Sequence, residues 1–186
     1  MSCVDIRGCR IGEGRPKVIL PIVERAEAAI LEKAAQFSTL PADCVEWRAD
    51  WFQECRDPAA VARCLQKLRV ALGSKLLLVT IRTKAEGGEL ALRHTEYTDL
   101  LHTILDTDCA DLIDIEFFPA GDDLPALIGD AHTAGAAVVC SSHDFHKTPP
   151  RAELVHRMVA MQQAGADLPK VAVMPQSRID VLELLA

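Results

Sequence analysis

The chain has 186 residues, which is enough for one domain with its own hydrophobic core. Its composition, 49% hydrophobic and 25% charged, is that of a folded globular protein and excludes a disordered chain. The net charge of −7 argues against a nucleic-acid-binding surface, no apolar run has the length of a membrane span, and the N-terminus lacks the apolar stretch of a secretory signal. We therefore expect a cytoplasmic single domain over residues 1–186, with neither nucleic acid nor membrane as a partner.

Residues 1–14 form the first unit along the chain. Val4 and Ile6 alternate with Asp5 and Arg7, and Gly8 then permits a turn before a second short run at 9–11. This alternation predicts a small β-hairpin that precedes the rest of the domain.

Residues 15–186 repeat one pattern, in which an apolar run is followed by a polar turn and a helical stretch. The repeat has the length of a βα unit and predicts a parallel sheet covered by helices. The expected strands are 17–23, 44–50, 76–82, 112–117, 137–142 and 170–174. Apolar stripes at helical spacing lie between them, and consist of Ile30, Leu31, Ala34 and Phe37, then Val61, Cys64, Leu65, Leu68 and Leu72, then Leu154, Val155, Met158 and Met161.

Two architectures fit six such units: an open doubly wound sheet and a barrel of the (β/α)₈ type. Charged residues cluster toward the C-terminal ends of several strands, which suits a barrel whose mouth holds a site. No GxGxxG follows the first strand, as a dinucleotide-binding sheet would require. We therefore expect a TIM-barrel type α/β fold in which about six of the eight βα units are present.

The second expected strand of this pattern, 44–50, carries three charges on one face. The two-residue period places Glu46, Arg48 and Asp50 together and turns Trp47 and Ala49 toward the helices. Inward-facing charges are costly unless they pair with one another or bind a polar ligand. The sequence leaves both an internal salt-bridge network and a binding site open.

Arg82 ends the next strand and is followed by a segment that contains Glu86 and the pair Gly87-Gly88. This composition predicts a flexible loop beside an acidic group, directly after a strand end. Asp114 and Glu116 share one face of the following strand, and we expect them to pair with Arg48 or Arg82.

Two further residues offer chemistry. His143 follows an apolar strand, and histidine is the side chain that titrates near neutral pH. Lys170 begins the last apolar run, with Ala172 and Met174 on the same face. A lysine in a dry cavity must lose its proton or find a partner, and a neutral amine forms Schiff bases with carbonyl compounds. His143 and His146 lack further ligands at metal spacing, so no metal or other cofactor is expected.

The seven cysteines show no CxxC spacing. Four of them lie in or beside apolar segments, namely Cys44, Cys55, Cys64 and Cys140. We expect these four to be small buried hydrophobes in a reducing compartment rather than disulfides or metal ligands.

The chain resembles the type I 3-dehydroquinate dehydratases. The matching segments are 46–50, 82–89, 114–118, 142–149 and 167–177, in family order and at family spacing over essentially the whole chain. The resemblance implies a (β/α)₈ barrel closed below by an N-terminal hairpin. It further implies dehydration of 3-dehydroquinate in the shikimate pathway, in a homodimer without a cofactor.

The resemblance also implies roles for individual residues. Lys170 would form the Schiff base with the substrate ketone, His143 would act as general base and acid, and Glu86 would orient His143. The residues lining the substrate pocket would be Glu46, Arg48 and Arg82.

Members of the family continue through a seventh and an eighth strand, for which nothing in this sequence matches. We therefore expect two unpaired sheet edges, with Glu46, Arg48, Arg82 and Lys170 open to water. Two other functions stay open: an impaired remnant that serves as a weak binder or partner, and another Schiff-base enzyme of the class I aldolase type.

Overall fold

The computed structural model describes residues 3–185. The chain begins with an antiparallel hairpin of β1 (Val4–Ile6) and β2 (Cys9–Ile11). Its two turn residues, Arg7 and Gly8, both have positive φ, as a two-residue type I′ turn requires. The backbone N–H of Gly8 also donates to the Asp5 carboxylate at 2.9 Å. The predicted N-terminal hairpin is confirmed.

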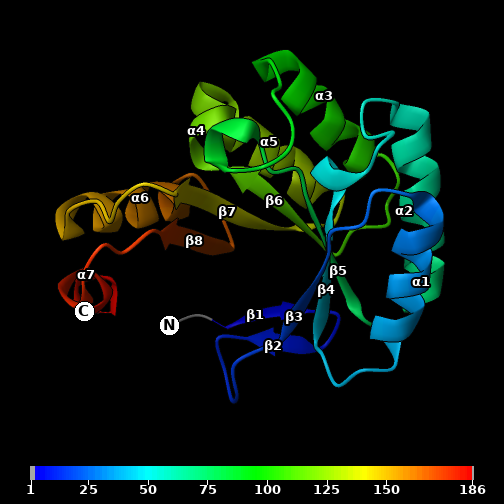
Figure 1. Cartoon of the computed structure of the whole chain (residues 1–186), viewed down its shortest axis with the longest axis horizontal. Coiled ribbons are helices and arrows are strands. Elements are labelled where there is room, and N and C mark those ends of the chain that lie inside the picture. The colour runs from blue at the N-terminus through cyan, green and yellow to red at the C-terminus, as the bar shows by residue number, and fades with distance from the viewer. Residues whose placement is uncertain (1–2, 186) are drawn as a thin grey trace.

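The main sheet consists, within the described residues, of six parallel strands in sequential order (Figure 1). All six predicted strands are present, with small shifts of their ends. The strands are β3 (Ile19–Ile22), β4 (Cys44–Arg48), β5 (Leu76–Thr80), β6 (Leu112–Glu116), β7 (Ala137–Asp144) and β8 (Leu168–Val173).

Three of the shifted strand ends change where candidate site residues lie relative to the strands. β4 ends at Arg48, so Asp50 lies in a following 3₁₀ turn, Ala49–Trp51, and not on the strand face. β7 runs on to Asp144, so His143 lies within the strand rather than after it. β8 begins at Leu168, which makes Lys170 its third residue rather than its first.

The helices follow the strands as the repeat predicts. They are α1 (Glu27–Ser38), α2 (Pro58–Leu72), α3 (His94–Leu105), α4 (Phe117–Ala120), α5 (Leu124–Thr133), α6 (Arg151–Gln163) and α7 (Arg178–Leu185). The start of α2 has a local cause, because Pro58 needs no hydrogen-bond acceptor there and Asp57 accepts the N–H of Ala59 at 2.9 Å.

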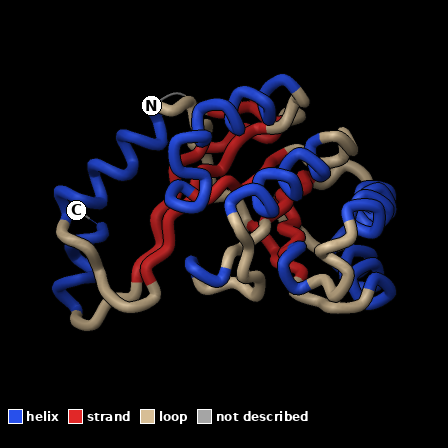
Figure 2. Tube along the Cα trace, turned by 90° about the horizontal axis from the view of Figure 1, so that it is seen from above, coloured by secondary structure: helices blue, strands red, loops and turns tan. Residues whose placement is uncertain are grey.

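Strand order and helix placement decide between the two candidate architectures. The order β3-β4-β5-β6-β7-β8 shows no reversal, whereas a doubly wound sheet changes direction at a switch point. Figures 1 and 2 show the helices on the outside of a curved sheet, with the hairpin below the curve. The fold is therefore a curled parallel half-barrel, and the predicted barrel type is confirmed.

The main core lies between the outer face of the sheet and the helices. Trp47 and Ala49 are buried in it, as predicted, and so is the whole α2 stripe. The α1 stripe is confirmed by Ile30 and Ala34, against which Leu31 and Phe37 pack half-buried. Each fully buried aliphatic side chain stabilises the fold by about 1.5–3 kcal/mol.

The predicted α6 stripe is wrong in part. Leu154 and Met161 are buried, but Val155 is 54% exposed and Met158 lies at the surface. Arg157 takes an inward position instead, with 9% of its surface exposed. The spacing rule found the helix but could not show which of two overlapping faces meets the sheet.

The concave side of the sheet is divided into an apolar lower part and a polar upper part. Ile6 of the hairpin packs there against Cys44, Leu76, Leu78, Leu112 and Val139, which lie toward the N-terminal ends of the strands. A pocket of about 390 Å³ is left between this cluster and the hairpin. The hairpin thus covers the bottom of the half-barrel, and the polar residues of the strands lie above it.

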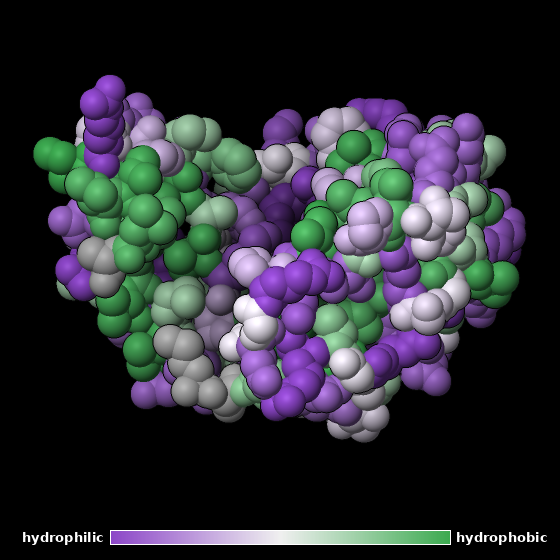
Figure 3. Space-filling model, turned by 90° about the horizontal axis from the view of Figure 1, so that it is seen from below, coloured by the Kyte–Doolittle hydropathy of each residue, from purple (hydrophilic) through white to green (hydrophobic). Residues whose placement is uncertain are grey.

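Apolar side chains are exposed at one end of the molecule, on α6, directly after β8 and on α7 (Figure 3). The residues are Val155, Met158, Val159, Met174, Ile179, Val181, Leu182, Leu184 and Leu185. The four cysteines expected in the interior, Cys44, Cys55, Cys64 and Cys140, are buried. None of the helices that the structure describes in residues 3–185 is both long and apolar enough to cross a bilayer.

Candidate active site

The polar site lies on the concave face, where the C-terminal ends of β4 to β8 meet. Strand register aligns its residues in rows: Thr80 lies opposite Asp114, Glu116 opposite Ser141, and Ser141 opposite Lys170. All of these positions share one face because side chains alternate along each strand. Residues far apart in the sequence are thereby brought to one rim.

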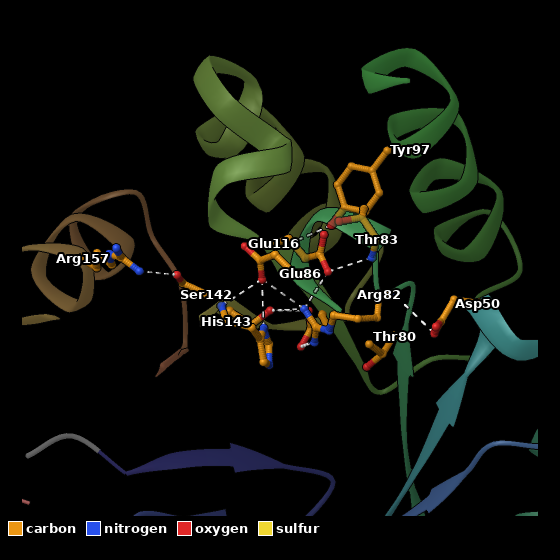
Figure 4. A network of polar contacts seen from close by, with 12 residues as sticks. Asp50, Thr80, Arg82, Thr83, Glu86, Tyr97, Glu116, Ser142, His143 and Arg157 are labelled. Atoms are coloured by element: carbon orange, nitrogen blue, oxygen red, sulfur yellow. Dashed lines mark hydrogen bonds and ion pairs between the residues drawn. The ribbon is translucent and has the colours of Figure 1, made fainter. Parts of the chain in front are cut away.

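Arg82 is the centre of this rim (Figure 4). One guanidinium nitrogen, Nη1, donates to Glu116 Oε1 and to Ser141 Oγ, both at 2.8 Å, and Nη2 donates to Asp114 Oδ2 at 3.0 Å. Asp114 and Glu116 thus pair with Arg82, as one of the two predicted alternatives had it. Arg82 is only 4% exposed, so the expectation that it lies open to water is wrong. Neighbouring side chains of its own sheet cover it, without help from further strands.

Arg48 and Asp50 form a second ion pair beside it. Arg48 donates through Nε and Nη2 to the two oxygens of Asp50, both at 2.8 Å. Asp50 also accepts the backbone N–H groups of Arg82 at 3.3 Å and Glu89 at 3.2 Å. Asp50 therefore ties Arg48 to the segment that follows β5. Of the two alternatives that the sequence left open, the internal salt bridge is therefore present between Arg48 and Asp50.

The segment after β5 is a compact hydrogen-bonded turn. Lys84 N donates to Leu90 O at 2.7 Å, and Gly88 N donates to Thr83 O at 2.8 Å. A Cβ at Gly88 would lie 1.9 Å from the carbonyl oxygen of Arg82, and one at Gly87 would lie 2.3 Å from the Phe145 ring. The two glycines, which suggested a flexible loop, are required here by close packing.

Glu86 ends a 3₁₀ turn in this segment, Lys84–Glu86, and contacts His143. Glu86 Oε2 lies 2.9 Å from His143 Nδ1 and accepts the backbone N–H of His143 at 3.1 Å. An ionised carboxylate can only accept hydrogen bonds, so it favours a proton on His143 Nδ1. The lone pair of the imidazole is then left on Nε2. Such an imidazole can accept a proton from a bound molecule.

Burial disfavours charge on both members of this pair. It raises the pKa of Glu86 to about 7, against the opposing effects of Arg82 and the backbone N–H of His143. It lowers the pKa of His143 to about 3, and the positive charges of Arg82 and Lys170 act in the same direction. The imidazole is therefore neutral at neutral pH, as a general base must be.

Lys170 stands at the edge of the site. It lies on the concave face of β8 and is exposed, which confirms the expectation that this residue lies open to water rather than in a dry cavity. The reason is that β8 is an edge strand of the sheet, with no strand of the described chain beyond it. Its charge nevertheless acts on His143, which places the two groups within electrostatic range.

Glu46 completes the set of residues singled out from the sequence. It is half-buried and accepts a hydrogen bond from Thr80 Oγ1 at 2.7 Å. The fold thus brings all six to one rim, from three strands and the segment that follows β5: Glu46, Arg48, Arg82, Glu86, His143 and Lys170. Among residues 3–185, no group of three potential metal ligands is placed to hold an ion.

Comparison with known proteins assigns the family. The type I 3-dehydroquinase family profile matches residues 18–186. A 3-dehydroquinate dehydratase of Bacillus licheniformis is 43% identical over 182 residues, covering 98% of this chain and 72% of that protein. The chain belongs to the type I 3-dehydroquinase family. Another relative, the 3-dehydroquinate dehydratase of Listeria monocytogenes, is 43% identical over 185 residues.

Solved structures agree with the assignment of the chain to this family. The type I 3-dehydroquinate dehydratase of Clostridium difficile with covalently modified comenic acid superposes with a TM-score of 0.96 at 39% identity, covering 99% of this chain and 73% of that one. The Enterococcus faecalis 3-dehydroquinate dehydratase superposes at 0.95 with 42% identity. An aldolase superposes at only 0.60 with 14% identity, a likeness of fold alone. The aldolase alternative is therefore not favoured for this 3-dehydroquinase.

Sequence reasoning missed several residues that support the site of this 3-dehydroquinase. Tyr97 of α3 is fully buried, and its hydroxyl oxygen accepts the backbone N–H of Glu116 at 2.8 Å. Ser141 links Arg82 to Asp114, to which its hydroxyl donates at 2.6 Å. Arg157 donates to Ser142 from the helix layer at 3.1 Å. The sequence feature that could have revealed these three residues is that each is a polar side chain at an inward position of an otherwise apolar pattern.

Proposed function

We propose that this chain converts 3-dehydroquinate to 3-dehydroshikimate in the shikimate pathway, by forming a Schiff base at Lys170 with His143 as general base and acid. Membership of the type I 3-dehydroquinases supports the reaction, and the arrangement of the rim supports the roles. The single observation that carries the proposal is the contact of Glu86 with His143 on the strand next to that of Lys170.

The first step joins the substrate to the chain. The Lys170 amine adds to the ketone carbon, a C–N bond forms, and the carbonyl oxygen leaves as water to give an iminium ion. The iminium withdraws electrons from the neighbouring carbon far more strongly than the ketone did. The C–H bond at that carbon therefore becomes acidic enough for a histidine to act on it.

His143 then moves the proton. Nε2 accepts the proton from the carbon, and the electron pair of the C–H bond passes into an enamine. The enamine expels the hydroxyl group of the next carbon, which leaves as water with a proton from the imidazolium. Water finally releases the product by hydrolysing the imine, so that the net change is loss of one water molecule. Proton transfer of this kind contributes about 10²–10⁴-fold in rate.

Glu86 acts through His143. Its carboxylate accepts the Nδ1–H bond and keeps Nε2 free, and it stabilises the imidazolium that forms for part of the cycle. The carboxylate must be ionised for both tasks.

Arg48, Arg82 and Glu46 provide the surroundings of the substrate. The chain is acidic as a whole, and Arg82 is neutralised by Asp114 and Glu116, so Lys170 and the partly accessible Arg48 are the cations placed to meet a carboxylate-bearing substrate. Arg48 is partly accessible and held in place by Asp50, so it can contact a ligand directly. Arg82 is saturated by its neighbours, and its contribution is the fixed positive charge beneath the site.

A turnover assay with a matched variant tests the proposal. Product formation is followed by the ultraviolet absorbance of its conjugated double bond, in the wild-type chain and in Lys170→Arg, which keeps the charge but cannot form an imine. We expect turnover in the wild type only. Equal rates in the two proteins would rule out the Schiff base, and a folded wild type without any turnover would favour the weak-binder alternative.

A further inference from the structure

Arg157 is a buried cation that the mechanism above does not use. It comes from α6, where an apolar side chain is expected, and lies against the outer side of β7. Its Nη1 donates to Ser142 Oγ at 3.1 Å (Figure 4). Its Nη2 pairs with Glu153, and its guanidinium lies 4.9 Å from the centre of the Phe118 ring. A buried guanidinium is costly, so its presence calls for a physical reason.

One reason is position. Ser142 directly precedes His143 on β7, and alternation turns Ser142 toward the helices while His143 faces the site. Arg157 therefore connects α6 with the end of the strand that carries His143, across the loop that joins them. The backbone N–H of His143, which donates to Glu86, lies one peptide away from this anchor.

The other reason is charge. Three buried carboxylates meet at the centre of the site, from Glu86, Asp114 and Glu116, and Arg82 is the one cation among residues 3–185 that pairs with all of them. Three carboxyl groups thus surround one guanidinium, and burial raises the pKa of both Glu86 and Glu116 to about 7 in spite of its charge. Arg157 opposes this effect at Glu86, where its charge lowers the pKa.

We propose that Arg157 is a positioning residue for the Glu86–His143 pair, which anchors the end of β7 through Ser142 and supplies the second positive charge that keeps the Glu86 carboxylate ionised. Its consequence for turnover rests on the function proposed above, but its effect on the pair does not. The charged and titratable groups around the pair come from every neighbouring element: Arg48, Arg82, Tyr97, Asp114, Glu116, Arg157 and Lys170. Of these, Arg157 alone acts from the helix side of β7.

The test compares three variants by NMR titration of ligand-free protein. Arg157→Met removes the charge, Arg157→Lys keeps it, and Ser142→Ala removes the anchor but leaves the charge. The imidazole resonances of His143, assigned by their loss in His143→Ala, report the ionisation of Glu86 through the Nδ1 hydrogen bond. The carboxylate that loses its partner in Arg157→Met is that of Glu153, whose side chain is 46% exposed and can be hydrated, so we expect this variant to fold.

We expect Arg157→Met to move the midpoint of this titration upward by about one pH unit, and Arg157→Lys to restore most of the shift. Ser142→Ala should leave the midpoint near that of the wild type while broadening the His143 resonances. An unchanged midpoint in Arg157→Met, or a shift that Arg157→Lys fails to restore, would overturn the electrostatic role. Should Arg157→Met not fold, the same comparison of Arg157→Gln with Arg157→Lys decides the matter. Because no turnover is needed, a failure of the proposed function leaves this result readable.

Discussion

The two members of the Glu86–His143 pair are joined twice, because Glu86 Oε2 contacts both the ring Nδ1 at 2.9 Å and the backbone N–H of the same histidine at 3.1 Å. The second contact fixes the carboxylate relative to β7, and the first then fixes the ring. The carboxylate comes from a 3₁₀ turn that is itself held by Asp50 and by the close approach of Gly88 to Arg82. A histidine on a strand thus receives its orientation from a loop that follows another strand.

Glu86→Gln should change the pH dependence of turnover. Burial raises the pKa of Glu86 to about 7, so the wild-type carboxylate ionises, and turnover rises, as the pH increases through about 7. The amide cannot ionise, so the variant should lack this rise and should be slower by about 10- to 100-fold at pH 8. Rates measured from pH 5.5 to 9 test this. A variant that keeps the same rise would show that another group causes it.

Arg82→Met should destabilise the fold much more than Arg48→Met. Removing Arg82 leaves Asp114 and Glu116 buried without their partner, which costs about 3–5 kcal/mol. Removing Arg48 leaves the single buried carboxylate of Asp50, which keeps the backbone N–H donors of Arg82 and Glu89, so the loss should be smaller, about 1–3 kcal/mol. Urea unfolding at pH 7 measures both losses. Equal losses would contradict the central structural place given to Arg82.

Glu116→Gln isolates the pH dependence of stability that this carboxyl group causes. Its pKa is raised from 4.5 to about 7 in the folded protein, so between these values the native state holds a proton that the unfolded state has lost. Stability due to this group is present below about pH 4.5 and declines as the pH rises through about 7, by about 3 kcal/mol in all.

Glu116→Gln serves as the reference for that experiment. The substitution changes the contact with Arg82 at every pH, so the informative quantity is how the difference in unfolding free energy between the wild type and Glu116→Gln changes with pH. Measured by urea unfolding at pH 5 and pH 8, the wild type should lose stability relative to Glu116→Gln at the higher pH. A difference that is the same at both values would exclude the raised pKa.

The chain is also expected to self-associate. Within residues 3–185, β3 and β8 are the outer strands of the sheet, and apolar side chains are exposed near both, such as Ile19 beside one and Ile179 beside the other. Unpaired strand edges with apolar neighbours favour association. Sedimentation over a range of concentrations should show dimers or larger species, as the expected homodimer requires. A monomer at the highest concentration would speak against it.

The sequence was sufficient for the strands and for most of the helix faces, because buried parallel strands are β-branched runs and the α2 stripe follows a single helical period. It also gave Arg82 as one of two possible partners of Asp114 and Glu116, since alternation and strand order place them on neighbouring rows. It also anticipated the exposure of Lys170 from the unpaired edge of its strand. Two features were beyond it. Arg157 is inward because of contacts with Ser142 and Phe118 that no local pattern contains, and Arg82 is buried because neighbouring side chains of the sheet cover it.

The central claim is that Lys170 forms an imine with a keto acid, and borohydride trapping tests it most directly. The chain is incubated with 3-dehydroquinate, reduced, and mapped by peptide mass spectrometry, alongside His143→Ala and Lys170→Arg. We predict a reduced adduct on Lys170 in the wild type and in His143→Ala, which should form the imine but turn over very slowly, and none in Lys170→Arg. A folded wild-type chain that is active yet yields no adduct at Lys170 would contradict the account.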